Sequence, residues 1–243
     1  MKKSTVLLVA AVLVLLASLT AYNMALRTEY RRGTYKDPLR DYAALPFTDF
    51  DEVVVEPGSV ARVRIEAGPY QVRRSPAAAE LLQVRQQGRR LVVSATLPAN
   101  VLALGWGEAL VIRCPRLTAV AADARFRRAG KPDLDQEPRF GRVLVRGFSG
   151  PDTLRLRQAH GSRLELQGNH LAGLVAEAGQ QPGARPELTL DATNELGATR
   201  LVLGHQSLLR LQGARLGHLR YQLADSVRLE LTGAALPGLA AAR

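Results

Sequence analysis

Between about residues 143 and 239, short segments of alternating apolar and polar residues recur along the chain. In four of these segments a polar residue stands between two leucines; these polar residues are Glu165, Thr189, Arg210 and Glu230. Side chains alternate between the two faces of a strand, so each segment predicts a strand with one leucine face and one polar face. A glycine or other small residue follows each segment, where a tight turn is expected.

The segments return at a nearly constant interval. The small residues that follow them are Gly147, Gly168, Ala192, Gly213 and Gly233, which gives steps of 21, 24, 21 and 20 residues. Such a period is typical of solenoids, in which each coil buries its apolar face only by stacking on its neighbours. A leucine-rich repeat has a similar period, but it requires Asn or Cys in the bend, where Gly, Ala and Asp stand here. We therefore predict an all-β protein, a β-helix-like parallel β-solenoid with coils of about 21 residues.

Residues 47–142 continue the β pattern in a less regular form. Strands are predicted at about 47–55, 60–65, 70–73, 84–86, 91–94, 109–112 and 117–120. The Gln87-Gly88 pair predicts a hairpin between the fourth and fifth of these strands, and Pro76 to Leu82 predicts one or two helical turns. Residues 125–142 are polar and rich in turn formers, so we expect a protruding loop there.

The N-terminal segment predicts a membrane-spanning helix. Its apolar run is unbroken from Val6 to Ala17, which suits a signal peptide, whereas the full stretch 5–26 would span roughly 33 Å as a helix, enough for a bilayer. No small-x-small cleavage site follows, and no cysteine stands near its end to accept a lipid. These observations favour an uncleaved signal anchor over a cleaved signal peptide. The expected organisation is an anchor at 1–26, a juxtamembrane stalk at 27–46 and a β-solenoid domain at 47–243.

Positive charges flank the predicted helix on both sides. Lys2 and Lys3 favour a cytoplasmic N-terminus, whereas Arg27, Arg31 and Arg32 after the span favour the opposite orientation. A short N-terminal tail and a long following domain, which can be translocated despite its charge, decide between them. We expect a single pass through the inner membrane, with residues 5–26 in the lipid bilayer and the C-terminal domain on the periplasmic, extracytoplasmic side.

The formal net charge of +11 is carried almost entirely by arginine. The arginines are spread along the chain and interleaved with Glu and Asp, and no group of aromatic residues accompanies them, so we predict solvated surfaces and no nucleic-acid partner. The single cysteine, Cys114, excludes an internal disulfide framework and a multi-cysteine metal site. It lies in a strand-like run and is expected to be a buried, inert thiol.

Three local patterns occur in order ahead of the repeats. They are Phe-x-x-Phe-x-x-Val at 47–53, Gly-x-Tyr-x-Val at 68–72 leading to Leu-Leu…Gly…Leu-Val-Val at 81–93, and Leu-Val-Ile-x-x-Pro-x-Leu at 110–117. Together with the repeats, they resemble the bacterial "putative auto-transporter adhesin, head GIN domain" family over about 47–239. The resemblance implies an exported parallel β-solenoid and carries no catalytic residues. The Gly-Ser-Gly bends usual in that family are missing here.

No motif in the chain indicates a reaction. Glycosidases need two carboxylates at a defined separation, but the predicted columns Gln167-Asp191-Gln212-Thr232 and Glu165-Thr189-Arg210-Glu230 do not place acids on adjacent coils. His160, His170 and His218 fall on predicted turns, and with His205 they show no metal-ligand spacing, so solvated side chains are expected. We therefore predict no catalytic, cofactor-binding or metal-binding residues and no cofactor.

The favoured function is a membrane-anchored, exported, non-catalytic adhesin-like or scaffold module with an unidentified protein or glycan ligand. Two alternatives remain at this point. A self-assembling, bactofilin-like solenoid is suggested by the weak C-terminal cap at Leu236 to Leu239, since uncapped solenoid ends expose strand edges. A carbohydrate-active β-helix enzyme would depend on Glu165, Asp191 and Glu230. The oligomeric state is left open.

Overall fold

The computed structural model describes residues 3–33, 37–105 and 107–232. It divides into two compact units, residues 1–42 and 43–243. The first unit contains the helix α1 (Lys3–Arg32), and the second consists mostly of β-strands. The weak cap predicted at 236–239, the last of the predicted small turn residues, Gly233, and the single tryptophan, Trp106, lie outside the described residues.

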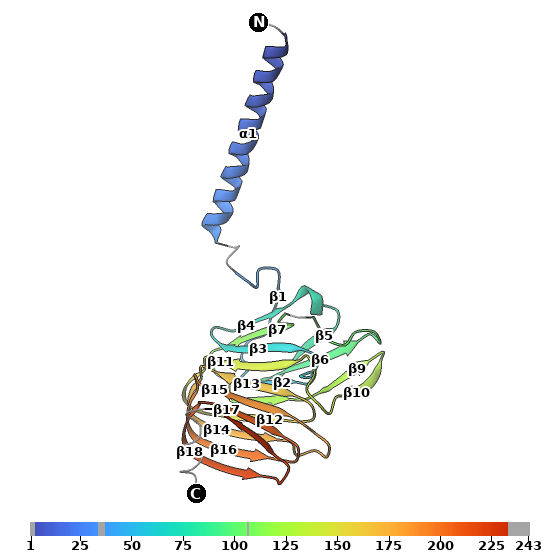
Figure 1. Cartoon of the computed structure of the whole chain (residues 1–243), viewed down its shortest axis with the longest axis vertical. Coiled ribbons are helices and arrows are strands. Elements are labelled where there is room, and N and C mark those ends of the chain that lie inside the picture. Colours follow the sequence, from blue (N-terminus) through green and yellow to red (C-terminus); the bar gives the residue numbers. More distant parts are fainter. Residues whose placement is uncertain (1–2, 34–36, 106, 233–243) are drawn as a thin grey trace. The chain divides into compact units, whose positions relative to one another are not determined.

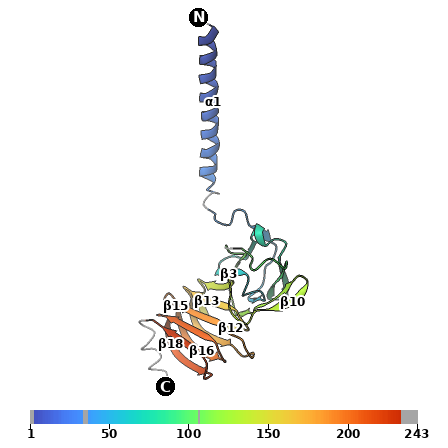
Figure 2. The same ribbon diagram turned by 45° about the vertical axis from the view of Figure 1, so that its right-hand side comes forward.

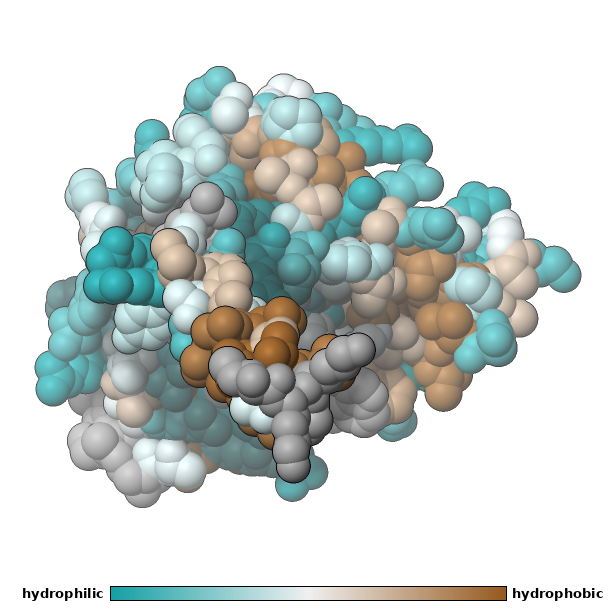
Figure 3. All heavy atoms as spheres, turned by 90° about the horizontal axis from the view of Figure 1, so that it is seen from above, coloured by the Kyte–Doolittle hydropathy of each residue, from teal (hydrophilic) through white to brown (hydrophobic). Residues whose placement is uncertain are grey.

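Helix α1 carries no charged residue from Ser4 to Leu26, and Figure 3 shows brown, hydrophobic side chains at its near end. Residues 5–31 are long and apolar enough to cross a membrane, a test that a signal sequence also passes, and this stretch is not buried against the protein. The hydroxyls of Ser18, Thr20 and Thr28 donate to the carbonyl four residues earlier, which satisfies these polar groups without water. The predicted apolar helix is thus present, and it continues beyond Leu26 to Arg32.

In the described part of the second unit the strands form two sheets, one with nine strands and one with ten. The first sheet has the order β1 (Ala43–Leu45), β4 (Gln71–Arg74), β7 (Leu110–Cys114), β3 (Arg62–Ala67), β11 (Arg142–Arg146), β13 (Arg163–Gln167), β15 (Glu187–Asp191), β17 (Leu208–Gln212) and β19 (Arg228–Leu231). The second has the order β10 (Lys131–Leu134), β9 (Arg125–Arg128), β6 (Arg90–Leu97), β2 (Glu52–Val55), β8 (Ala119–Ala122), β12 (Ser149–Gln158), β14 (His170–Ala178), β16 (Glu195–Leu203) and β18 (Arg215–Leu223), with β5 (Leu82–Gln87) beside β6.

From β11 onward the chain alternates between the two sheets, and each strand pairs in parallel with the strand one step later in the same sheet. Figure 1 and Figure 2 show these strands stacked in layers. In the first sheet the register aligns two apolar columns, Val143-Leu164-Leu188-Leu209-Leu229 and Val145-Leu166-Leu190-Leu211-Leu231. The predicted alternation is therefore confirmed. Each fully buried leucine in these columns contributes roughly 2 kcal/mol of burial.

The sheets are mixed, so the parallel β-solenoid predicted for 47–243 is not confirmed. Antiparallel pairs join β1 to β4, β4 to β7, β5 to β6 and β9 to β10. Short connections cause two of them, because Gly88 and Gly130 adopt positive φ and let adjacent strands turn back on each other. The predicted β5–β6 hairpin is confirmed, as is a short 3-10 helix at Pro76–Ala78 (η2).

The prediction of a protruding loop at 125–142 is wrong for the first half of that segment. Residues 125–134 form the β9–β10 hairpin, and β9 also pairs in parallel with β6. The arginines that made this segment look like a solvated loop alternate with Phe126, which is buried in the core. A strand with one buried aromatic and charged neighbours therefore gave too weak an apolar signal to be recognised.

Candidate functional site

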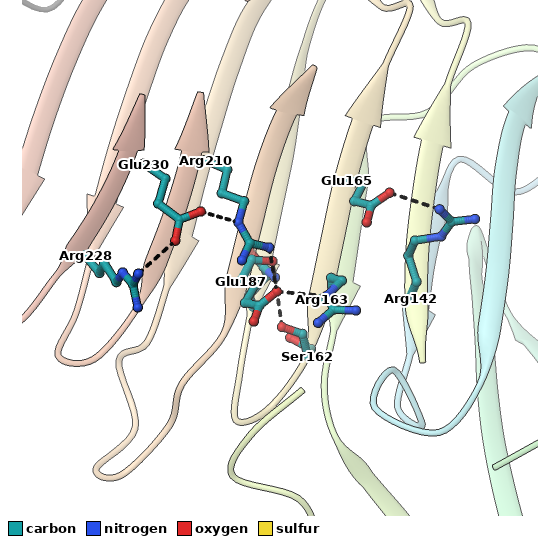
Figure 4. A network of polar contacts seen from close by, with 9 residues as sticks. Arg142, Ser162, Arg163, Glu165, Glu187, Arg210, Arg228 and Glu230 are labelled. Carbon is teal, nitrogen blue, oxygen red and sulfur yellow. Dashed lines mark hydrogen bonds and ion pairs between the residues drawn. The ribbon is translucent and has the colours of Figure 1, made fainter. Parts of the chain in front are cut away.

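The outer face of the first sheet carries paired charges over its parallel strands (Figure 4). The ion pairs, at 2.6–3.3 Å, are Arg142–Glu165, Arg163–Glu187, Arg210–Glu187, Arg210–Glu230 and Arg228–Glu230. The Arg210 guanidinium donates to Glu230 at 2.6 Å and holds the pKa of that carboxyl below its ordinary value. Acids and bases at these positions thus largely neutralise each other. On β3, β7 and β11 of the same sheet, one carboxylate, Glu66, meets three arginines, Arg64, Arg113 and Arg146.

The outer face of the second sheet is different. Its register aligns one row across seven strands, from β6 to β18, which reads Arg90, Glu52, Ala119, Arg155, Val175, Arg200 and Arg220. Because neighbouring strands lie about 4.8 Å apart, Arg200 and Arg220 are one strand spacing apart and Arg155 lies two further strands away. Four arginines therefore stand in a line perpendicular to the strands.

Only Arg90 has an acidic partner in this line, Glu52 at 3.0 Å. The exposed side chains of Arg155, Arg200 and Arg220, here called the arginine row, have no hydrogen-bonding or ionic partner in the described part of the chain. The arginine row is therefore a positive stripe that an anionic partner could neutralise.

Small aliphatic residues form the floor between these arginines. A second row on the same face reads Val92, Val54, Ala121, Arg157, Glu177, Val202 and Gln222. Two shallow hollows, of about 370 and 330 Å³, lie over β6, β2, β8 and β12 and share Val54, Ala121 and Arg157. Short side chains beside long arginines leave this part of the face hollowed.

At the N-terminal ends of β14, β16 and β18, the charged side chains on the same face neutralise one another. His170, Glu195 and Arg215 occupy one register position on β14, β16 and β18. Glu195 lies 3.2 Å from His170 Nδ1 and accepts from Arg215 at 2.7 Å. The hydrogen bond from His170, with the charge of Arg215, lowers the pKa of Glu195. The unpaired charge on these strands is therefore that of the arginine row, further along each strand.

One histidine–carboxylate pair could suggest acid–base chemistry. Asp123 is buried at the end of β8; its Oδ1 lies 2.7 Å from His160 Nδ1 and accepts from the Ala124 amide, and its Oδ2 accepts from Arg125. The neighbouring hydroxyl, Ser162, is fully buried and donates to the Ala122 carbonyl, so it is not placed to act as a nucleophile. The pair joins the ends of β8 and β12.

The carboxylates considered for a carbohydrate-active enzyme do not converge. Glu165 and Glu230 share a register column but are separated by Thr189 and Arg210, which is three strand spacings or roughly 14 Å. Glycosidase carboxylates lie about 5–9.5 Å apart. Asp191 accepts from the amide and hydroxyl of Thr193, which fixes the bend after β15. In the described ranges no cluster of three His, Cys, Asp or Glu side chains could hold a metal ion.

The predicted positions of the histidines need correction. His170 and His218 lie on β14 and β18, not on turns, while His205 lies on a turn. His160 is on a turn but is partly buried against Asp123, so the expectation of a solvated side chain is wrong for it. Its φ of 51° places it in the left-handed region, where non-glycine residues are uncommon.

Sequence reasoning missed the arginine row. The charges of the first sheet are interleaved with acids as predicted, but the segments of the second sheet have arginine between inward-facing residues without an acid on the adjacent coil. Leu154-Arg-Leu156 and Thr199-Arg-Leu201 are examples, in which both flanking residues are buried. Each coil has a second strand segment after its small turn residue. Aligning these second segments with one another would have placed Arg155, Arg200 and Arg220 near one another.

No family model matches the chain, and no curated protein matches it either. Among solved structures, the chain is similar to a "putative adhesin" from Bacteroides fragilis, with a TM-score of 0.41 and 10% identity over 79% of this chain and 96% of that one. It is also similar to a "putative adhesin" from Parabacteroides distasonis, with a TM-score of 0.31 and 9% identity over 79% of this chain and 94% of that one.

Proposed function

We propose that this chain is a non-catalytic, adhesin-like or scaffold binding module, anchored in the inner membrane by one helix and exported so that its β unit lies outside the cytoplasm. The observation that carries the proposal is the arginine row, an exposed stripe of three unpaired guanidinium groups in a β unit where most other described arginines lie in ion pairs. Unpaired like charges held in line do not stabilise a fold, so they point to a partner.

Helix α1 supports the anchor. Leu7, Leu13 and Val14 are each more than 60% exposed, and an apolar surface of this length favours lipid as its surroundings. In the proposed organisation residues 5–26 lie in the bilayer, 27–46 connect to the domain and 47–243 form the binding domain. The proposed orientation is supported by Lys2 and Lys3 ahead of the span and by the long domain that follows it, which can be translocated despite its charge.

The parallel strands from β11 onward support a solenoid-like scaffold. Every coil adds one strand to each sheet, so side chains at equivalent positions form rows that run perpendicular to the strands. A rigid surface with a repeated spacing suits recognition of a repeating or extended partner. At the N-terminal side of the stack the parallel coils end, and antiparallel strands pair there with the last of them.

A non-catalytic role is supported by the contacts that the candidate carboxylates make. Glu165 and Glu230 are held in ion pairs, Asp191 fixes a bend, and Asp123 has its carboxylate oxygens occupied by structural partners. A catalytic pair needs at least one group free to exchange a proton with a substrate. These carboxylates are engaged in holding strands and bends together.

Cysteine labelling in intact cells tests the orientation. The native chain offers one thiol, Cys114, which is buried and is expected not to react. A Lys131→Cys variant places a thiol on the exposed turn side of β10, and a Ser4→Cys variant places one near the N-terminus. With a membrane-impermeant maleimide, we expect labelling of Lys131→Cys once the outer barrier is opened and labelling of Ser4→Cys only after the inner membrane is dissolved.

The reverse labelling pattern would place the β unit in the cytoplasm and overturn the exported module. A mass equal to that of the chain without its first residues, measured on the purified protein, would replace the anchor with a cleaved signal peptide. Both results are independent of whether any ligand has been identified.

A further inference from the structure

We infer that the arginine row binds a linear acidic glycan, laid across the strands of the second sheet and contacted through its carboxylate or sulfate groups. This inference rests on the proposed function, because it names the class of partner for the same surface. It uses the spacing of the charges, the chemistry of the floor between them and the absence of features that other polyanions require.

The spacing suits a repeating polyanion. Arg200 and Arg220 stand on adjacent strands about 4.8 Å apart, and Arg155 follows two strands further on, with Val175 between. An extended chain of pyranose rings advances by a comparable distance with each sugar. Guanidinium groups bind carboxylates and sulfates through paired N–H donors, so successive acidic sugars could each meet one arginine.

The small aliphatic side chains between the arginines suit contact with sugar rings. Ala119 and Val175 lie in the same line as the arginines, and Val54, Ala121 and Val202 lie in the neighbouring line. Pyranose rings present C–H groups that pack on small aliphatic side chains. On β18, His218 and Gln222 flank Arg220 at alternate positions, and both are exposed, so they offer polar groups for sugar hydroxyls.

Nucleic acid and membranes fit this surface less well. Single-stranded nucleic acid binds by stacking bases on aromatic side chains, and neither of the two aligned rows contains an aromatic residue. Binding to a lipid surface is strengthened by large apolar side chains that enter the interface. The exposed large apolar residues of the described β unit, which are Leu102, Leu134, Phe140, Tyr221 and Leu229, lie outside both rows.

The test measures binding of the full chain, held in nanodiscs of uncharged lipid, to polygalacturonate and to chondroitin sulfate. Methyl-esterified polygalacturonate is the matched ligand control, because it keeps the sugar backbone and loses the charge. Single-stranded DNA and vesicles containing anionic lipid represent the other polyanions. The test variant is Arg155→Gln/Arg200→Gln/Arg220→Gln. The matched control variant, Arg85→Gln/Arg127→Gln/Lys131→Gln, removes the same charge from three exposed positions outside the row that have no acidic partner in the described part of the chain.

We expect wild type to bind at least one acidic glycan, with affinity falling as salt is added, and not to bind the esterified form. The row variant should bind about tenfold more weakly, since three exposed ion pairs are lost, while the control variant should stay within about twofold of wild type. The row variant should unfold at the same urea concentration as wild type or a higher one, because it removes only unpaired charges.

Three results would overturn the inference. One is no binding to either acidic glycan at low ionic strength. Another is an equal loss in the row and control variants, which would show diffuse attraction to net charge. The third is tighter binding to DNA or anionic vesicles than to the glycans, which would assign the row to that partner. If labelling still places the β unit outside the cytoplasm, the exported module stands and only its ligand class is rejected.

Discussion

The side-chain amide of Asn169 donates to the side-chain oxygen of Asn194 at 2.9 Å, inside the stack of coils. The same Asn169 nitrogen donates to the Val145 carbonyl, and Asn194 donates to the Leu166 carbonyl, so each amide also bonds the coil before it. The oxygen of Asn169 accepts from the Phe148 amide. Both asparagines are fully buried, and together they bond backbone groups of successive coils, in and just after strands β11 and β13.

Asn169→Ala should therefore be strongly destabilising. It leaves the buried Phe148 amide and the Val145 carbonyl without these partners, and each such group costs roughly 1–3 kcal/mol. We expect the free energy of unfolding to fall by about 2–4 kcal/mol, measured by urea denaturation of the full chain in detergent micelles. Asn100→Ala, at an exposed turn, is the control and should be near neutral. Equal midpoints for the two variants would show that the buried amides are not stabilising.

Two glycines bring consecutive coils into backbone contact. A Cβ on Gly204 would lie 1.9 Å from the carbonyl oxygen of Gly179, and the Gly204 amide donates to the Ala178 carbonyl at 2.7 Å. Gly204→Ala must push these coils apart, which should cost roughly 1–3 kcal/mol. The thermal unfolding midpoint of the full chain is the measurement. Gly88→Asn, at a hairpin turn with open space around it, should change the midpoint little, and the idea fails if Gly204→Ala is equally tolerated.

Asp51 should make stability depend on pH. Arg89 donates to both of its carboxylate oxygens, at 3.0 and 2.6 Å, and this lowers the pKa of Asp51. The unfolded pKa is about 3.9, so the stabilisation is complete above that pH and is lost as pH falls through the lower folded value. Asp51→Asn should lower the urea midpoint at pH 7, and the difference from wild type should shrink below about pH 4.

The exposed Asp225→Asn variant serves as the comparison for Asp51. The difference between its urea midpoint and that of wild type should be small both at pH 7 and below about pH 4. A difference for Asp51→Asn that stays constant from pH 7 to pH 3 would show that the ion pair with Arg89 is not the source of the effect.

Cys114 should resist alkylation in the folded chain. It is fully buried on β7, and burial, with the nearby charge of Asp51, raises the pKa of its thiol to about 12. Because the thiolate is the reactive form, iodoacetamide at pH 8 should leave it unmodified until the protein is unfolded in detergent or urea. Mass spectrometry gives the extent of labelling, with Lys131→Cys as the reactive reference. Labelling of Cys114 at the same rate would contradict its burial.

The charges on the first sheet should contribute modestly. Glu187 accepts from Arg163 at 2.8 Å and from Arg210 at 3.1 Å, and all three side chains are partly buried. Glu187→Gln should lower the free energy of unfolding by about 1 kcal/mol at low ionic strength and by less at high salt. Urea unfolding at two salt concentrations measures this. A cost that does not change with salt would indicate lost packing in place of lost charge pairing.

The sequence by itself determined the apolar helix and the repeating strands. Leu164, Leu166, Leu188 and Leu190 alternate with polar residues, and burial of such a pattern leaves one choice of face for each strand. The column Glu165-Thr189-Arg210-Glu230 follows from the same period and is confirmed by the register. These features are local, because each depends on spacing within a coil or on a constant step between coils.

Only the tertiary structure decided which charges are paired. Arg210 and Arg200 stand in similar alternating segments, yet Arg210 meets Glu187 and Glu230 while Arg200 meets Val175 and Arg220. The partner of each side chain lies on another coil, some 20 residues away, and the coils differ in length. The β5–β6 hairpin could be predicted from its Gln87-Gly88 turn, but the antiparallel pairing of β4 with β1 and β7 could not, because it depends on contacts that spacing along one strand does not record.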